Sequence, residues 1–135
     1  MTVEWRFVKV APKADNTGVL VHMQLPEKVW PKCIECQGMH DKQGEFWMQG
    51  GATCKGHETA ETRHVTTPEA SNEKPVGEWN TFQAECAGSN VKVFINGRLM
   101  NEAVECNVSS GFIGIQSEGA DIEVRKVYLV PLKSS

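Results

Sequence analysis

Polar side chains at alternating positions of three strand-like segments could carry out acid–base chemistry. Successive side chains of a strand point to opposite faces, so a strand with one apolar face gathers its polar residues on the other. If the apolar residues form the core, the opposite face collects His22, Gln24, Glu35, Gln37, Gln116 and, just beyond its strand, Glu118. Carboxylate and imidazole groups can transfer protons, and amides can bind hydroxyl-rich ligands. Half of every such strand is polar in any case, so a merely solvated face is the alternative.

Two tryptophans add a weaker indication of binding. Trp30, beside Pro31, and Trp47 could offer flat platforms for a sugar ring, whereas Trp5 and Trp79 fit core positions. For any single tryptophan, packing in or beside the core is the commoner role. Trp30 and Trp47 are therefore the candidate aromatic contacts.

A histidine-containing segment offers a possible metal site. His57, Glu61 and His64 have helical i, i+4 and i+7 spacing, which would place them on one face of a helix. The segment around them is polar and lacks helical periodicity, so a solvated loop is the preferred interpretation. We predict no metal ligands here.

The five cysteines are predicted to be free thiols. An odd number without a signal peptide is typical of a reducing compartment. Cys33 and Cys36 form a CxxC pair, but on a strand they would point to opposite faces, which argues against zinc or redox chemistry. Most of the cysteines should behave as small buried hydrophobes.

Length and composition exclude several classes of protein. The 135 residues are enough for one domain, which we place at 1–135. The net charge is −3 and no basic run occurs, so a nucleic-acid partner is not expected. No apolar stretch approaches the roughly 20 residues that span a bilayer, so no membrane partner is expected either. The first residues lack the apolar region of a signal peptide, which predicts a cytoplasmic protein, or a secreted or periplasmic one if the chain has been trimmed.

The elements that position the polar residues are predicted to be short antiparallel strands. Asn96-Gly97 lies between alternating apolar residues and predicts a type I′ hairpin turn, in which both central residues have positive φ. A long polar loop is expected at about 52–75, with one short strand near 63–66. The predicted strands are 3–10, 18–24, 32–39, 45–49, 79–86, 90–95, 98–101, 111–116 and 122–129. Short strands with frequent turns predict an all-β antiparallel sandwich.

Several stretches carry a resemblance to a known family. They are DNTGVLVHM, KVWPKCIECQ, GEFWMQGG, GEWNTFQAECAG, VKVFINGRLMNEA and GFIGIQSEGADIEVRKVYLVPL. Together they resemble the 3-keto-disaccharide (3-keto-glycoside) hydrolase domain, a concanavalin A-like lectin/glucanase sandwich of jelly-roll type. The match runs almost end to end, but family members usually have further strands before the one that begins here at Val3. Their absence implies exposed sheet edges, so we expect a homodimer or another cover for the edge.

The resemblance implies a carbohydrate cleft on the outer face of one sheet, and it favours Glu35, Gln37 and Gln116 in particular. A 3-keto group acidifies the neighbouring C2 hydrogen, so a base can remove it and the glycosidic oxygen can leave by elimination before water adds. Glu35 or His22 could be that base, and a divalent metal or Gln116 could stabilise the enolate. For a simple glycosidase, which uses two carboxylates, the pair to test would be Glu35 and Glu118.

Two other functions remain open at this stage. A non-catalytic, lectin-like module could use the same cleft, and an oligomeric scaffold could have lost the activity. The shortened N-terminus favours both. Glu123 and Arg125 match family positions, and we interpret Arg125 as structural. No oxygen-rich loop suited to calcium is evident.

Overall fold

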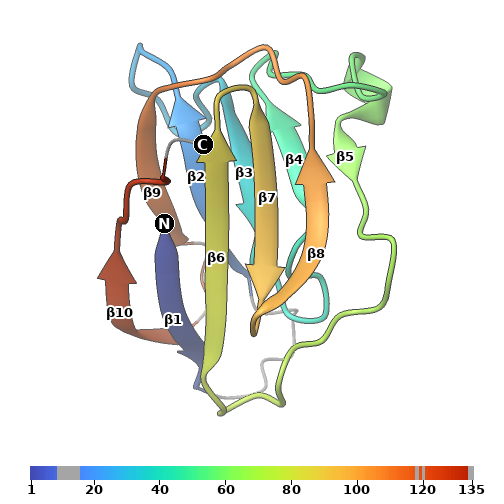
Figure 1. Ribbon diagram of the computed structural model, residues 1–135. Coiled ribbons are helices and arrows are strands. Elements are labelled where there is room, and N and C mark those ends of the chain that lie inside the picture. The colour runs from blue at the N-terminus through green and yellow to red at the C-terminus, as the bar shows by residue number, and fades with distance from the viewer. Residues whose placement is uncertain (9–15, 118, 120, 134–135) are drawn as a thin grey trace.

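The computed structural model describes residues 1–8, 16–117, 119 and 121–133, which form two antiparallel five-stranded sheets (Figure 1). The first sheet has the strand order β10-β1-β6-β7-β8 and the second has the order β5-β4-β3-β2-β9. The elements are β1 Thr2–Phe7, β2 Thr17–Met23, β3 Cys33–Gln37, β4 Phe46–Gln49, the 3-10 helix η1 Ala60–Thr62, β5 His64–Val65, β6 Asn80–Ala87, β7 Asn90–Ile95, β8 Arg98–Ala103, β9 Phe112–Ser117 and β10 Ile122–Tyr128. The predicted β-sandwich is confirmed.

The segment predicted as a long polar loop contains two short elements. The 3-10 helix η1 is followed, after Arg63, by β5, which pairs with β4 at the edge of the second sheet. The short strand expected near 63–66 is therefore present. The first predicted strand, 3–10, ends at Phe7 in the structure, and positions 9 and 10 lie outside the described residues. None of the described helices is long and apolar enough to cross a membrane.

The Asn96-Gly97 turn has the predicted conformation. Its φ angles are 51° at Asn96 and 83° at Gly97, the two positive values that a type I′ turn requires. The Asn96 side chain also accepts a hydrogen bond from the Thr81 amide at 2.9 Å and donates one to Asn80 Oδ1 at 3.0 Å. The turn between β7 and β8 is thus tied to the start of β6.

The core lies between the two sheets and follows the two-residue period of the strands. Val3, Trp5 and Phe7 on β1 are buried, whereas the residues between them are only partly buried. The Trp5 ring packs against Phe82 with their centroids 4.9 Å apart, and its Nε1 donates to Gln43 Oε1 at 3.4 Å. On the second sheet, Ile34 and Cys36 point into the same core, so their neighbours Glu35 and Gln37 point outward.

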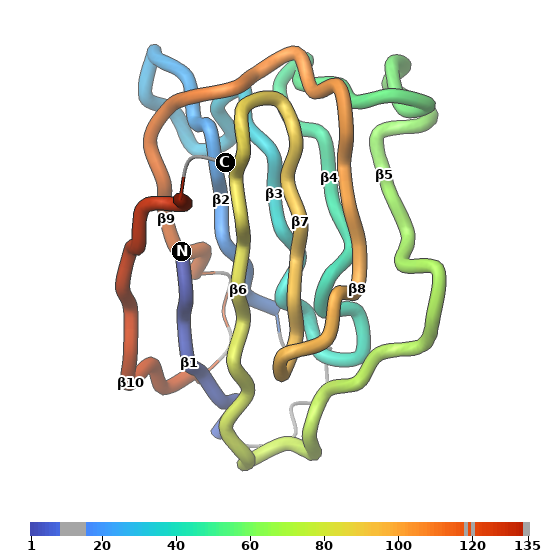
Figure 2. The backbone as a smooth tube through the Cα atoms, in the orientation of Figure 1, coloured from blue at the N-terminus to red at the C-terminus, as the bar shows by residue number. Residues whose placement is uncertain are grey.

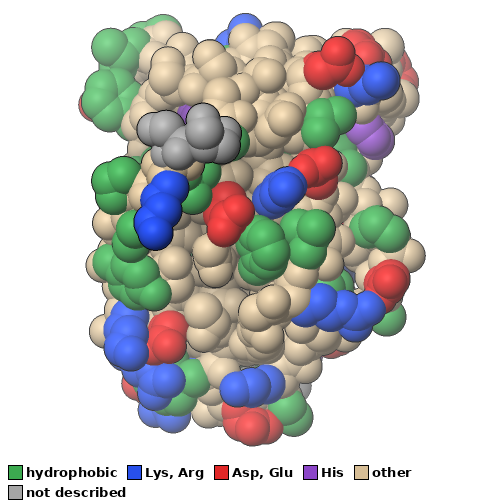
Figure 3. All heavy atoms as spheres, in the orientation of Figure 1, with side chains coloured by type: hydrophobic (Ala, Val, Ile, Leu, Met, Phe, Trp, Pro, Cys, Tyr) green, Lys and Arg blue, Asp and Glu red, His purple; other side chains and the backbone are tan. Residues whose placement is uncertain are grey.

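One side of the sandwich is open. The edge strands β9 and β10 belong to different sheets but lie on the same side of the molecule (Figure 2). Three residues of these strands pair directly with core residues and yet remain exposed by 38–51%: Ile115, Val124 and Val127. A cavity of about 740 Å³ lies between the two edges, and hydrophobic side chains are visible along the β10 side (Figure 3). We call this region the open seam.

Candidate functional site

The outer face of the second sheet carries a row of side chains that crosses four strands. Strand pairing places Leu20 opposite Glu35, Glu35 opposite Trp47, and Trp47 opposite His64. Directly opposed residues of antiparallel strands lie on the same face, about 4.5–5.5 Å apart at Cβ. The row therefore brings a carboxyl group, an indole and an imidazole together on the outer face.

Glu35 is buried even though it points away from the core. Only 3% of its surface is exposed, and the Gln49 amide donates a hydrogen bond to Glu35 Oε2 at 2.8 Å. The oxygen of the same Gln49 amide accepts a bond from Arg63 Nη1 at 3.0 Å. A buried carboxyl group requires such partners, because burial removes it from water. The chain from Arg63 through Gln49 fixes the position of the Glu35 side chain.

Gln37 and Gln116 lie on the same face, on either side of Gly18. Gly18 pairs with Gln37 on β3 and with Gln116 on β9, and both glutamines are at least 90% buried. A Cβ atom at position 18 would lie 2.9 Å from the Gln116 Oε1 atom and 2.9 Å from the Cys36 carbonyl oxygen. Because Gly18 has no side chain, the Gln116 amide can lie over β2, next to β3, the strand that carries Glu35.

Replacing Gly18 by alanine should therefore destabilise the protein by about 1–3 kcal/mol, because the new methyl group overlaps a fixed backbone oxygen. Chemical denaturation monitored by fluorescence would measure the change. Gly114→Ala is the matched control, because its Cβ would meet only the flexible end of Met23, at 3.1 Å. Equal losses for the two variants would show that crowding at Gly18 is not the cause.

Trp47 makes two contacts that involve its ring. The His64 imidazole stacks on it with centroids 4.1 Å apart and planes 5° apart, and the Arg63 guanidinium lies 5.1 Å from the ring centroid. His64 Nε2 also makes a very short contact with the Glu45 carboxylate. A sugar that stacked on Trp47 would have to share the ring with these groups, so its binding role stays a prediction.

His22 and Gln24 are placed differently from the alternation that groups them with Glu35. The pairing of β2 with β9 shifts register between Leu20 and Met23, and His22 has a φ of 53°. His22 lines the cavity of the open seam, where burial lowers the pKa of its imidazole. Gln24 donates hydrogen bonds to the carbonyl oxygens of His22 at 2.9 Å and Ser110 at 2.6 Å. Its contacts are therefore those of a residue that holds the start of β9.

Of the two remaining predicted residues, the structure describes only Trp30. Trp30 lies on the connection between β2 and β3 and is 39% exposed. Glu118 lies outside the described residues. The proposed pairing of Glu35 with Glu118 thus stays a prediction.

The histidine-containing segment does not form the helix that a shared metal site would need. Between His57 and His64 lies the short 3-10 helix η1, and His57 Nδ1 lies 2.6 Å from the Thr62 carbonyl oxygen. His64 contacts Glu45 instead. The preferred interpretation as an exposed loop agrees with these contacts.

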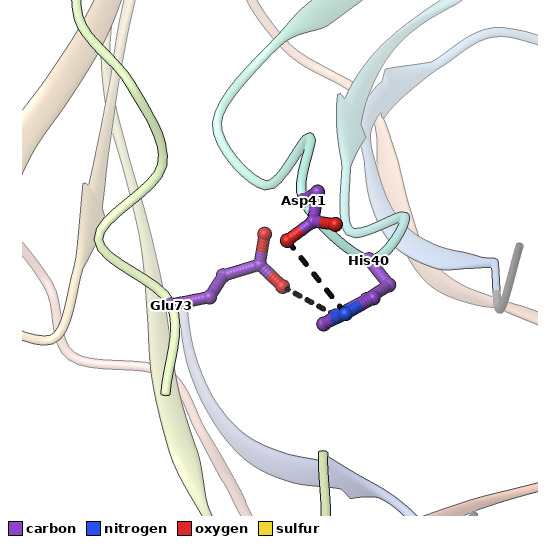
Figure 4. Close-up of side chains that lie close together, drawn as sticks. All are labelled: His40, Asp41 and Glu73. Atoms are coloured by element: carbon purple, nitrogen blue, oxygen red, sulfur yellow. Dashed lines mark ion pairs between the residues drawn. The ribbon is translucent and has the colours of Figure 1, made fainter. Parts of the chain in front are cut away.

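A different cluster could hold a divalent cation (Figure 4). His40 Nδ1 lies 3.4 Å from Glu73 Oε1, and His40 Nε2 lies 3.6 Å from Asp41 Oδ1. The Glu73 carboxylate is 3% exposed and accepts hydrogen bonds from Ser71 and from Gln43. Burial raises the pKa of Glu73 despite these bonds. In the part of the chain that is described, this is the one group of three residues with suitable metal ligands.

Sequence reasoning missed Gln49, Glu45 and Arg63. The alternation of 45–49 contained a signal, because Phe46 and Met48 are buried and their neighbours must lie on the face of Glu35. Arg63 carried no such signal, because its position depends on β5 returning to pair with β4.

The fold and this face define a β-sandwich with buried polar groups on the outer side of one sheet. Residues 1–130 match the 3-keto-alpha-glucoside-1,2-lyase-like domain. The chain belongs to this family. None of the curated proteins matches it.

Two crystal structures of proteins from Parabacteroides distasonis, each described as a "putative glycosyl hydrolase", share the fold. The first is 16% identical, with a TM-score of 0.60 over 91% of this chain and 65% of its own. The second is 18% identical, with a TM-score of 0.53 over 93% of this chain and 76% of its own. This chain therefore spans 65% of the length of the first.

Proposed function

We propose that the outer face of the second sheet binds a carbohydrate and eliminates the aglycone of a 3-keto-glycoside, with Glu35 as the base. The observation that carries the proposal is the buried Glu35 carboxyl group, which lies in one row with Trp47 and His64. Family membership supports the substrate class. The finer description of the fold as a concanavalin A-like jelly roll belongs to the same proposal.

In the proposed reaction, Glu35 takes the C2 proton that lies beside the ketone, and the electron pair of the C–H bond forms an enolate. Collapse of the enolate expels the glycosidic oxygen, and water then adds to the enone. Gln37 and Gln116 provide amide donors for the ketone and hydroxyl groups. In this proposal His64, which contacts Glu45, protonates the leaving oxygen. Glu35 is preferred to His22 as the base because His22 lines the open seam instead.

If a divalent cation takes part, His40, Asp41 and Glu73 are the residues that would hold it. Such an ion would lie beside Gln43, outside the row of Glu35, Trp47 and His64. The steps assigned to Glu35 and His64 do not depend on it.

Reaction in deuterated water tests the elimination route. Abstraction at C2 followed by addition to the enone should leave deuterium at C2 of the released sugar. A control without enzyme corrects for spontaneous exchange of the keto sugar. Released sugar without deuterium above that control would contradict the proposal, because direct hydrolysis leaves the C2 hydrogen in place.

A lectin-like binding module is the second candidate. Three amides, those of Gln37, Gln49 and Gln116, lie on the same face as the Glu35 carboxyl group, and the Gln49 amide donates to it. Amides can bind the hydroxyl groups of a sugar without taking part in a reaction. Binding of a parent glycoside and its 3-keto form with equal affinity, without turnover, would favour this function.

We also propose that a second copy of the chain covers the open seam. Both sheets end on this side in unpaired edge strands, which readily pair with another chain. A two-fold axis could extend both sheets at once by pairing each edge strand with its own copy. Within one chain, Glu123 on β10 pairs with Arg6, and Lys126 pairs with Glu4. If β10 of one copy paired antiparallel with β10 of the other, centred between positions 124 and 125, Glu123 of each copy would lie opposite Lys126 of the other. These opposite charges would attract each other.

Sedimentation velocity tests the dimer, which should have about twice the 15.0 kDa mass of one chain. Val127→Lys should shift the protein toward the monomer, because it places a charge among the exposed apolar residues of the seam. Val29→Lys is the control, since Val29 is 88% exposed in the connection after β2. A monomeric wild-type protein at tens of micromolar, or an equal effect of both variants, would contradict the proposal.

A further inference from the structure

Cys54 and Cys106 lie opposite each other where two loop segments run antiparallel. The amide of Lys55 donates to the Val104 carbonyl oxygen at 2.8 Å, and the amide of Asn107 donates to the Thr53 carbonyl oxygen at 3.0 Å. Residues between two such bonds form the close, non-hydrogen-bonded pair of an antiparallel ladder. The Asn107 side chain strengthens the connection, since its Oδ1 accepts from the Thr53 amide at 2.9 Å.

A bulge at Glu105 and Cys106 turns the Cys106 side chain toward Cys54. The ladder leaves both Glu105 and Cys106 opposite Cys54, and Glu105 has a φ of 53°. The Glu105 carboxylate points outward, 3.5 Å from the Lys55 ammonium group. Cys54 and Cys106, exposed by only 2% and 7%, both belong to the core cluster. The two thiols therefore point to the same side of the pair.

We propose that Cys54 and Cys106 are a redox-active pair that forms a reversible disulfide. The two thiols are close enough to share a hydrogen bond, and a narrow antiparallel pair is compatible with the Cα separation of about 4.4–6.8 Å that disulfides use. All five cysteines are free thiols in the structure. This proposal does not depend on the proposed carbohydrate chemistry.

The environment of Cys54 suits it to be the attacking group. A hydrogen bond from Cys106 lowers the pKa of Cys54, and nearby His57 acts in the same direction. The thiolate is the nucleophile in disulfide exchange, so a lowered pKa increases the reactive fraction of the thiol. The turn that follows Cys54 is exposed at Lys55 and Gly56, which gives a small disulfide its approach once the turn opens.

The oxidant is a small-molecule disulfide such as oxidised glutathione. The Cys54 thiolate attacks one of its sulfur atoms, the S–S bond breaks, and the first thiolate leaves and takes up a proton. Cys106 then loses its proton, attacks the Cys54 sulfur and expels the second thiolate. The protein thiols lose two electrons, and the small disulfide becomes two thiols.

The disulfide would join the end of β8 to the segment that leads into η1 and β5. That segment carries Arg63 and His64, which contact Gln49 and Trp47 on the candidate face. Oxidation should therefore stabilise the edge of the second sheet. For a bridge between residues this far apart, we expect the melting midpoint to rise by about 5–10 °C.

Peptide mapping tests the pairing. The native protein is incubated with oxidised glutathione, the remaining thiols are alkylated, and a non-reducing tryptic digest is analysed by mass spectrometry. Cleavage after Lys55, Lys92 and Arg98 separates Cys54, Cys86 and Cys106 into three peptides. We expect one dominant cross-linked pair that contains Cys54 and Cys106, with the mass of two hydrogen atoms lost.

Cys86→Ser is the control, because Cys86 is the half-buried thiol that contributes electrostatically to Cys106. This variant should keep the cross-link and the rise in melting midpoint, whereas Cys54→Ser and Cys106→Ser should lose both. A dominant link to Cys86, glutathione adducts alone, or no oxidation of the wild-type protein would overturn the proposal. Mapping of the wild-type protein decides the matter even if a serine variant fails to fold.

Discussion

Replacement of Glu35 by glutamine should lower the turnover of a 3-keto-glucoside by about 10²–10⁴-fold, the usual contribution of a general base. Glutamine has the same shape but cannot accept the C2 proton. The Gln49 amide, which donates to Glu35 Oε2 at 2.8 Å, could still donate to the new amide oxygen, so the fold should be kept. Steady-state kinetics would give the loss, and circular dichroism would confirm the fold.

Glu102→Gln is the matched control for this experiment. Glu102 is exposed on β8 of the other sheet, where it pairs with Lys92 at 3.6 Å. Its replacement should leave turnover unchanged. An unaltered rate in Glu35→Gln, or an equal loss in Glu102→Gln, would rule out Glu35 as the base.

Replacement of Trp5 by alanine should lower the free energy of unfolding by about 3–5 kcal/mol. Trp5 has no exposed surface, packs on Phe82 and lies against Gly38, where an added Cβ would come within 2.7 Å of the indole. The variant would leave a cavity, and it would also remove the donor that Gln43 Oε1 uses. Urea denaturation would measure the loss.

Trp30→Ala is the corresponding control, because Trp30 is 39% exposed outside the sheets. The loss should be much smaller than for Trp5, since partly exposed side chains leave no closed cavity. A loss below about 1 kcal/mol for Trp5→Ala would contradict the prediction, because it would show that the buried Trp5 ring contributes little to the stability of the core.

The strands and the hairpin could be predicted because their signals are local. The alternation at Val3, Trp5 and Phe7 indicates which face of the strand is buried, whichever strand pairs with it. Asn96-Gly97 likewise records a backbone conformation that few other residue pairs adopt easily. The same alternation placed Glu35 and Gln37 opposite Ile34 and Cys36, and the structure has them there.

The placement of His22 could not be predicted because it depends on distant residues. Its strand shifts register where it meets β9, and Gln24 joins the His22 carbonyl group to that of Ser110, which lies 86 positions after Gln24 in the chain. A bulge of this kind leaves no trace in the alternation of β2 itself. Arg63 was missed for a similar reason, since its contact with Gln49 exists only after β5 has paired with β4.

The central claim is that the outer face of the second sheet acts on 3-keto-glycosides, and a turnover assay tests it most directly. Purified protein is offered a panel of 3-keto-glucosides and the parent glucosides, with and without a chelator, and released sugar is followed. We expect release from the keto substrates alone, because only they have an acidic C2 hydrogen for Glu35 to remove. Release from the parent glucosides at a similar rate, or no release from any substrate, would contradict the claim.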